Sequence, residues 1–549
     1  MGRYAWKLWA AATGSAGLLE LPFPLAGPMP PWRSVFAALG LVPLLWAILA
    51  SESISKTSRP LRRAFFASYL CGFLWYCGNC YWVRDTMMRY GDMPAGAPTL
   101  LLFGFSAVLG LYFAAFGLAV AFVRKSTGSV RLALIAAPFF WAALELAAAR
   151  ITSVPWDQLG YSQVDNILIN WLAAWTGVYG ISFLLVAVNA LLVAFVLLEQ
   201  PLARRVGAAG MLLLLLVWAG VLIPAPRPQT SDTAVLVQPN LDVGSDDAWG
   251  AVDWDRHMTE FAHLAAETCK SFIAGIPQTH APERHIDCPA NPPHPNLIVW
   301  PESPAPFFEH DLRFQRSIAS IALADQSPMV VNGIGSDFVP DSGQVLDHVS
   351  AIIYRADGTE LGRYDKIHLV PFGEYVPFAK LLFFAHKLTG RVSAFTPGLE
   401  RKVFLLGGHR YGVFICYEAV FADEVRQFVR LGANVLVNIS DDGWYGDTSA
   451  PWQHLNMTRM RAIENRRWIL RDTNSGVTAV IDPYGRVLQS IPRHQVDALP
   501  ARYGFRDDVT FYTAHGDVFS WACAILGLGL TVWCWIAGQN PKTRSKVRS

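Results

Sequence analysis

The chain has 549 residues, of which 52% are hydrophobic and 16% charged, and its formal net charge is +2. It is too long for one ordinary domain and too apolar for a typical soluble protein, so the composition predicts a membrane protein. The small net charge argues against an extended nucleic-acid-binding surface. The eight cysteines lack the paired spacing of a structural zinc site, so we expect neither a metal nor a cofactor.

Several apolar stretches are long enough to cross a bilayer, which takes about 20 helical residues. They lie at 34–51, 64–83, 99–123, 131–149, 169–198, 206–223 and 518–538. An eighth stretch at 6–21 is shorter and contains Glu20. We expect it to be a retained helix, with the core of a signal peptide as the alternative. The pattern predicts an α-helical transmembrane bundle of about eight helices.

Lysines and arginines gather in alternate connections between these stretches, at 56–63, 124–131, 204–205 and 542–548. Positively charged short loops stay in the cytoplasm. We therefore expect the large polar segment, 225–515, to lie outside it, in the periplasm next to the inner membrane of a Gram-negative bacterium. Tryptophans near the helix ends, such as Trp32, Trp82, Trp156 and Trp521, are candidates for interface anchors or for ordinary lipid contacts.

The segment 225–515 has shorter apolar runs, separated by glycine, proline, asparagine and aspartate. Strands are predicted at 235–238, 297–300, 330–334, 349–354, 403–406, 412–416 and 435–439, and helices at 254–272, 312–324, 423–431 and 452–466. This alternation predicts an α/β domain whose sheets are covered on both faces. The chain then divides into a membrane domain at 1–224, a catalytic domain at 225–515, and a last transmembrane helix with a basic cytoplasmic tail at 516–549.

Three segments each place a residue that can do chemistry at or after the end of a short buried run: Glu302, Lys366 and Cys416. A thiol is mostly protonated near neutral pH and needs a base to become a nucleophile. Glu302 follows Trp300 and Pro301, an apolar setting that suits a general base. Lys366 is the candidate cation for the oxyanion that forms at an ester carbonyl, helped by the backbone N–H after Cys416.

The motifs around these residues resemble those of the nitrilase, or carbon–nitrogen hydrolase, superfamily. They are Trp300-Pro301-Glu302, the run from Lys366 to Glu374 with Tyr-Val-Pro after it, Cys416-Tyr417-Glu418, and the run from Asn438 to Trp444 with Tyr-Gly after it. More narrowly, almost the full length resembles the apolipoprotein N-acyltransferase family. Asp441 and Gly443 depart from the pattern, which has asparagine and alanine there.

The resemblance implies an α/β nitrilase-like domain with an αββα sandwich fold, and it implies an N-acyltransferase acting by a ping-pong reaction. Glu302 would be the general base, Lys366 would stabilise the tetrahedral intermediate, and Cys416 would carry the acyl thioester. The implied partners are a phospholipid acyl donor, membrane lipid, and the N-terminal amine of a diacylglyceryl-cysteine lipoprotein as acceptor. Supporting or substrate-binding positions would be Glu374, Tyr417, Glu418 and Trp444.

Two other readings use the same residues. A membrane-tethered nitrilase-like amidase or hydrolase would pass the acyl group to water. A transporter or receptor would use the periplasmic domain only to bind a ligand, although we see no internal repeat of the kind transporters often have. We further expect the apolar loop at 374–396 to cover the cleft, and we leave open whether Cys269 and Cys288 form a disulfide beside the proline-rich segment 277–296.

Overall fold

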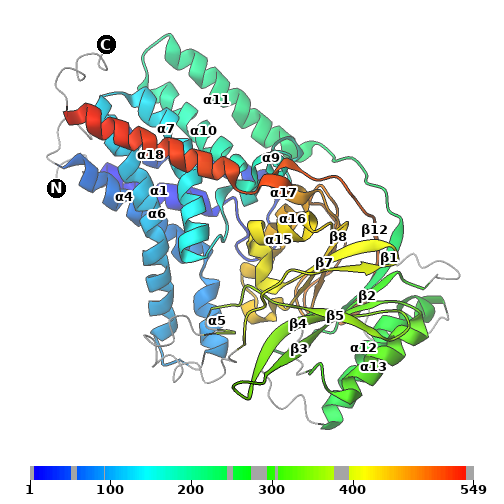
Figure 1. The fold of residues 1–549 in the computed structure, drawn as a ribbon. Helices are drawn as coiled ribbons and strands as arrows, with labels where there is room; N and C mark the ends of the chain where they lie inside the picture. The colour runs from blue at the N-terminus through cyan, green and yellow to red at the C-terminus, as the bar shows by residue number, and fades with distance from the viewer. Residues whose placement is uncertain are drawn as a thin grey trace.

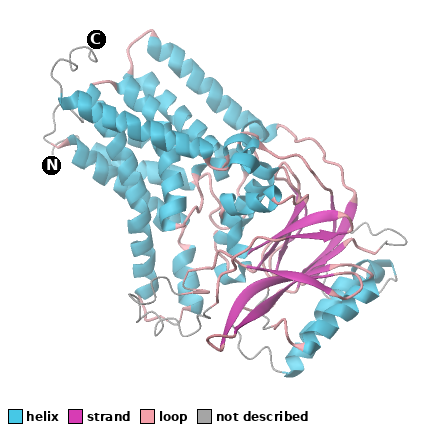
Figure 2. Cartoon of the chain, viewed as in Figure 1, coloured by secondary structure: helices cyan, strands magenta, loops and turns pink. Residues whose placement is uncertain are grey.

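The structure, a computed structural model, describes residues 5–50, 59–91, 93–243, 251–273, 294–302, 307–371, 373–375 and 395–539. Apolar helices from the first part of the chain lie together with the last helix, and a mixed part of strands and helices lies beside them (Figure 1). All strands belong to the mixed part (Figure 2).

Within the described residues, six helical segments are long and apolar enough to cross a membrane: Pro31–Leu49, Ala97–Thr127, Val130–Thr152, Val178–Leu197, Leu202–Leu222 and Val518–Ala537. They correspond to η1 (Pro31–Ala38) with α2 (Val42–Leu49), α6 (Ala97–Thr127), α7 (Val130–Ala147) with η2 (Ala148–Thr152), α10 (Val178–Leu197), α11 (Leu202–Ala219) with η4 (Gly220–Leu222), and α18 (Val518–Gln539). The other two predicted spans also form helices, α1 (Ala5–Glu20) and α4 (Pro60–Asn79), but both fall below this measure of length and hydropathy.

The predicted span at 169–198 is one continuous helix only from Val178 onward. The structure has two short helices, α8 (Ile167–Asn170) and α9 (Ala173–Thr176), before α10. The break is at Gly177, whose φ of +65° favours glycine. A side chain there would also meet the ring of Tyr512, 2.5 Å from the position of a Cβ. The chain therefore turns at Gly177 to make room for α17 (Phe511–His515).

Small residues allow α4 and α6 to approach closely. A Cβ on Gly117 would lie 1.8 Å from the hydroxyl of Ser68, and one on Gly72 would lie 2.6 Å from Phe113. Such contacts are typical of helix pairs in membranes, where close packing replaces the hydrophobic drive to associate. After α4, the short helix α5 (Trp82–Tyr90) leads toward the mixed part.

The mixed part contains two six-stranded sheets, with strand orders β12-β1-β2-β3-β4-β5 and β11-β10-β9-β8-β7-β6. The strands of the first are β1 (Asp232–Gln238), β2 (Leu297–Val299), β3 (Met329–Val339), β4 (Gln344–Tyr354), β5 (Glu360–Asp365) and β12 (Asp497–Tyr503). Those of the second are β6 (Val403–Leu406), β7 (His409–Ile415), β8 (Val435–Ser440), β9 (Ile469–Thr473), β10 (Thr478–Ile481) and β11 (Val487–Ile491). In both sheets the central strands are parallel: β1, β2 and β3 in one, and β7, β8 and β9 in the other.

The sheets pack face to face, and helices cover their outer faces. On β1, Ala234 and Leu236 join a core shared with β7 and β8, whereas Val235 and Val237 face α12 (Ala251–Ile273) and α13 (Leu312–Asp325). The second sheet is covered by α15 (Ala422–Arg430) and α16 (Ala450–Asn465). Because successive side chains on a strand alternate between faces, apolar runs on both faces produce the predicted αββα sandwich. The predicted division at 224/225 and 515/516 remains a prediction.

Every strand predicted from the sequence is present, but five strands were missed. β9 hides its strand character because Arg471 and Asp472 are both fully buried in it. β5 is an edge strand rich in charged residues, and β10 has only four residues. Helix α16 lies between the second sheet and the apolar helices, where Met457, Met460 and Ile463 join the core of the helical part. One helix therefore serves both parts of the molecule.

Candidate active site

The three residues predicted to do the chemistry come together. Glu302 follows β2, Lys366 follows β5 and Cys416 follows β7, so two come from the first sheet and one from the second. All three are buried, with exposed fractions of 8%, 0% and 5%. Facing strand ends in a two-sheet sandwich converge, which is how groups far apart in sequence share one site.

Lys366 lies between two carboxylates. Its Nζ donates to Glu374 Oε1 at 2.6 Å and to Glu302 Oε1 at 3.2 Å. Burial alone lowers the pKa of Lys366, but the charges of Glu302 and Glu374 outweigh it and raise this pKa well above its usual value. Burial raises the pKa of Glu374, against the opposing charge of Lys366. Lys366 is therefore a fixed cation, which suits it to stabilise an oxyanion.

The second oxygen of Glu302 is held by the other sheet. The backbone N–H of Asp441, just after β8, donates to Glu302 Oε2 at 3.0 Å. The side chain of Asp441 accepts from Gly443 N at 2.9 Å and from Asn474 Nδ2 at 3.1 Å. Burial and the nearby charge of Glu302 raise the pKa of Asp441 well above its usual range. With both oxygens fixed, Glu302 has one orientation relative to the cysteine.

Cys416 occupies a strained turn between β7 and the short helix η6 (Cys416–Val420). Its φ is +47°, a left-handed value that side chains other than glycine rarely adopt and that is typical of functional positions. Burial and the charge of Glu302 raise the pKa of the Cys416 thiol well above its usual value, although Lys366 opposes them. The resting thiol is therefore protonated, and its attack requires a base to take the proton.

Glu418 joins the lysine loop to the cysteine loop. Its Oε1 accepts from Tyr364 Oη and from Ile367 N, both at 2.7 Å. Its Oε2 accepts from Ile415 N, also at 2.7 Å. Because these donors flank Lys366 on one side and Cys416 on the other, Glu418 fixes the distance between the two loops. Burial raises its pKa, and the backbone donors lower it.

The site lies where the two parts of the molecule meet. Tyr417 Oη donates to Ser153 O in the helical part at 3.2 Å. Trp156 donates from Nε1 to Gln453 Oε1 at 2.8 Å, and its ring contacts the rings of Trp82 and Tyr445. The prediction that Trp156 anchors the protein at a lipid interface is wrong, because this side chain is buried between the two parts.

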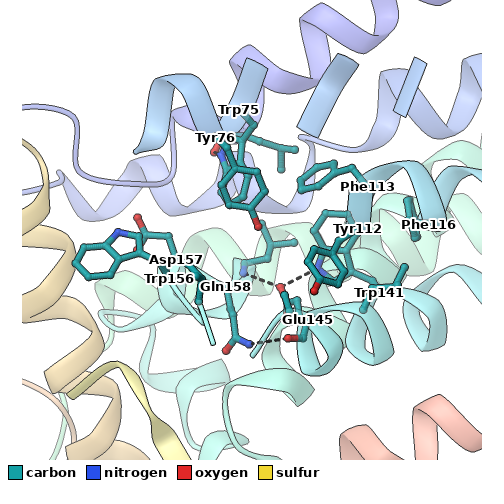
Figure 3. Close-up of a pocket in the computed structure, with 15 residues that line it drawn as sticks. Trp75, Tyr76, Tyr112, Phe113, Phe116, Trp141, Glu145, Trp156, Asp157 and Gln158 are labelled. Carbon is teal, nitrogen blue, oxygen red and sulfur yellow. Dashed lines mark hydrogen bonds between the residues drawn. The ribbon is translucent and has the colours of Figure 1, made fainter. Parts of the chain in front are cut away.

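A cavity of about 40 Å³ lies in the helical part, lined by Trp156 and by other aromatic side chains (Figure 3). Glu145 lies at its wall and accepts from Trp141 Nε1 at 2.8 Å and from Leu159 N at 2.9 Å. Such a volume holds a few water molecules.

Other predicted features have different outcomes. Trp444, on η7 (Asp442–Tyr445), is 42% exposed and packs its ring against Tyr90 of α5, so it is not among the residues that contact Lys366 or Glu302 in the described structure.

Most of the predicted covering loop at 374–396 lies outside the described residues, as do Cys288 and nearly all of the proline-rich segment. The question of the Cys269–Cys288 disulfide also lies outside what is described.

Sequence reasoning missed a second buried group beside the cysteine. His454 Nε2 lies 3.0 Å from Cys416 O, and His454 Nδ1 lies 2.9 Å from Asp442 Oδ1. Arg471 Nη2 donates to Asp442 Oδ2 at 2.7 Å. Asp442 lay within a recognised motif, but nothing in the sequence pairs it with a histidine on α16 and an arginine on β9.

Fold and site together define a carbon–nitrogen hydrolase type of α/β enzyme joined to an apolar helical part. The family model described as carbon-nitrogen hydrolase matches residues 268–497, and the one described as apolipoprotein N-acyltransferase N-terminal domain matches residues 15–191. The chain belongs to the apolipoprotein N-acyltransferase family, and it is a membrane-bound acyltransferase.

Two relatives carry this assignment. The apolipoprotein N-acyltransferase of Geobacter metallireducens is 33% identical over 499 residues, which cover 89% of this chain and 90% of that protein. The apolipoprotein N-acyltransferase of Allorhizobium ampelinum is 31% identical over 505 residues, covering 88% and 87%. Among solved structures, Saccharomyces cerevisiae Nit3, of branch 10 of the nitrilase superfamily, is similar with a TM-score of 0.34 and 16% identity, covering 51% of this chain and 93% of that one.

Proposed function

We propose that this enzyme moves a fatty acyl group from a phospholipid, through a thioester on Cys416, to the N-terminal amine of a diacylglyceryl-cysteine lipoprotein. The observation that carries the proposal is the convergence of Cys416, Glu302 and Lys366 at a buried site that borders the apolar helices. Nucleophile, base and cation are the three groups that acyl transfer through a thiol requires.

In the first half-reaction, the Cys416 sulfur attacks the ester carbonyl of the donor while Glu302 accepts the thiol proton. Negative charge moves to the carbonyl oxygen, where Lys366 Nζ and the N–H of Tyr417 stabilise it. The intermediate collapses, the C–O bond to the glycerol breaks, and Glu302 returns its proton to the departing alkoxide. The products are an acyl thioester on Cys416 and a lysophospholipid.

In the second half-reaction, the amine of the acceptor attacks the thioester carbon. Glu302 accepts a proton from the amine, the C–S bond breaks, and the proton returns to the thiolate. The amide product is more stable than the thioester, so no nucleotide is consumed. The two carboxylates have separate tasks, because Glu374 stays bound to Lys366 and to Val370 N.

The apolar helices explain how such an enzyme reaches its donor. Pulling a chain of 16 carbons into water costs roughly 12 kcal/mol at about 0.8 kcal/mol per methylene group. An enzyme held at the membrane avoids this cost. We propose that the membrane is the bacterial inner membrane and that the catalytic part is periplasmic, because basic residues such as Arg124, Arg204 and Arg205 mark the opposite ends of the helices as cytoplasmic.

The supporting residues have separate tasks in this proposal. Glu374 orients Lys366, Glu418 fixes the spacing of the two loops, and Tyr417 supplies a backbone donor next to the thioester. Trp444, exposed beside α5, is a candidate contact for the acceptor or for lipid.

Reconstitution in vesicles tests the proposal. The enzyme is given a phospholipid with a labelled acyl chain and a synthetic diacylated lipopeptide with a free N-terminal amine. We expect a labelled amide on the lipopeptide and a stoichiometric amount of lysophospholipid. Release of labelled free fatty acid at the same rate with and without the lipopeptide would instead identify a hydrolase. An N-acetylated lipopeptide is the matched control and should accept nothing.

A further inference from the structure

His454 lies next to the backbone of the nucleophile. Its side chain is fully buried on α16, and its Nε2 lies 3.0 Å from the carbonyl oxygen of Cys416. Its other nitrogen, Nδ1, lies 2.9 Å from Asp442 Oδ1. The ring is stacked against Trp156 from the helical part, with centroids 6.2 Å apart and planes 22° apart. Contacts on both edges and on the face therefore fix the ring.

The hydrogen-bond partners of the His454 ring indicate where the ring carries a hydrogen. A carbonyl oxygen only accepts hydrogen bonds, and so does an ionised carboxylate. Burial raises the pKa of Asp442, but the charge of Arg471 outweighs it and lowers this pKa below its usual value. Arg471 Nη2 donates to Asp442 Oδ2 at 2.7 Å and also lies 3.2 Å from His454 Nδ1. Because the Cys416 carbonyl can only accept, His454 Nε2 carries a hydrogen and donates to it.

The carbonyl that accepts from His454 belongs to the peptide bond between Cys416 and Tyr417. The N–H of this same peptide group is the backbone donor that faces the developing oxyanion in the proposed reaction. Hydrogen bonds in a chain polarise one another, so a donor on a carbonyl makes the N–H of that amide a stronger donor. Donors aimed at developing charge in a water-excluded site contribute most to acyl-transfer rates.

We infer that His454, held by Asp442 and Arg471, is a positioning residue that polarises the Cys416–Tyr417 peptide group and so strengthens its N–H as an oxyanion donor. The inference rests on the proposed function, since it requires Cys416 to attack an acyl carbonyl. It extends the site by a buried histidine that acts through the backbone of the nucleophile. The His454 hydrogen bond to the carbonyl of Cys416 also stabilises the strained backbone at this residue, whose φ is +47°.

Two reactions of the same thiol separate polarisation from simple support. Acylation by phospholipid passes through an oxyanion, whereas alkylation by iodoacetamide displaces iodide and forms none. In His454→Ala we expect acyl-enzyme formation, followed by mass spectrometry, to slow about 100-fold, the loss typical of one oxyanion donor. Alkylation of Cys416 should change less than about threefold, because the base and the thiol are untouched.

His454→Gln is the conservative partner, since its amide can still donate to the Cys416 carbonyl. It should recover much of the lost rate, to within about 10-fold of wild type. If His454→Ala does not fold, the same comparison in His454→Gln decides. Thermal unfolding of each variant in detergent monitors folding.

The inference fails if acylation and alkylation fall together, because the residue would then only hold the cysteine in place. It also fails if neither reaction changes. A wild-type enzyme that is alkylated but never acylated by phospholipid would refute the proposed function itself, which is a distinct result.

Discussion

Two groups of buried carboxylates, one beside the cysteine and one in the helical part, are held by different kinds of donor. In the catalytic part, Glu302 and Glu374 flank Lys366, and Asp442 is paired with Arg471. Each of these carboxylates lies within 3.2 Å of a buried cation. The nearby cations favour the ionised form of these carboxylates, whereas burial alone would favour the neutral form.

In the helical part, two buried carboxylates, Glu145 and Asp157, accept from neutral donors. Glu145 binds Trp141 Nε1 and Leu159 N, and Asp157 accepts from Asn79 Nδ2 at 2.9 Å. Among the residues that the structure describes, neither forms an ion pair with a lysine or arginine. These two carboxylates fasten the turn at 157–159 to the helices. Beside the cysteine the carboxylates are thus paired with buried cations, whereas these two carboxylates of the helical part are held by neutral donors.

Among the variants of these carboxylates, Glu302→Gln should lower the acylation rate most. Glutamine keeps the shape and the acceptor for Asp441 N but cannot take the thiol proton. Acyl-enzyme formation should fall by up to about 10⁴-fold, the upper range for a general base. Stopped reactions analysed by mass spectrometry measure the rate.

Glu309→Gln is the control for this change, because Glu309 is equally buried but is paired with Arg363 rather than with Lys366. It should acylate at a rate close to wild type. Equal losses in the two variants would contradict a special role for Glu302.

Lys366→Met removes the cation shared by Glu302 and Glu374. Acylation should fall about 10³-fold, because an oxyanion donor is lost and two carboxylates then face each other without a positive charge. The matched control is Lys402→Met at an exposed lysine, which should leave the rate unchanged. The same vesicle assay measures both. A Lys366→Met enzyme with wild-type rates would show that the cation plays no part in the reaction.

Asp442→Asn should lower stability by about 3–5 kcal/mol near neutral pH, because it leaves the buried Arg471 without its partner. The pKa of Asp442 is lowered in the folded state, so its contribution is present above the ordinary value of about 3.9 and is lost as the pH falls below it. Thermal unfolding in detergent at pH 7 and at pH 3.5 measures this.

The difference in unfolding temperature between wild type and Asp442→Asn should be larger at pH 7 than at pH 3.5. A difference of the same size at both values would mean that the charge of Asp442 does not stabilise the fold.

Glu145→Gln tests the helical side and should have the smallest effect. Glutamine retains an oxygen that can accept from Trp141 Nε1 and Leu159 N, and no ion pair is lost. We expect less than about 1 kcal/mol of destabilisation and an acylation rate within about threefold of wild type. Thermal unfolding and the vesicle assay measure these. A loss of stability as large as that of Asp442→Asn would show that the two groups of carboxylates do not differ in this way.

Much of this architecture could be predicted from the sequence because its signals are local. The apolar stretches predict helices, and the strands that precede Glu302 and Cys416 are visible as short apolar runs, whereas β5 before Lys366 is not. The residues of the site itself were found because specific motifs surround them. Their distances could not be predicted, since they depend on how two sheets face each other.

The missed features all depend on contacts between distant segments. β9 contains the charged residues Arg471 and Asp472, which sequence alone would place at the surface. Both are buried, because hydrogen-bond partners on other elements surround them. The break at Gly177 exists because Tyr512, far along the chain, occupies the space beside it. His454 reads as an ordinary helical residue until α16 is placed against the cysteine loop.

The measurement that tests the account most directly is the mass of the peptide containing Cys416 after the enzyme is exposed to phospholipid alone. We predict an added fatty acyl group on this peptide, removable by hydroxylamine and absent in Cys416→Ala. An adduct on another residue, or undiminished transfer to the lipopeptide by Cys416→Ala, would contradict the account.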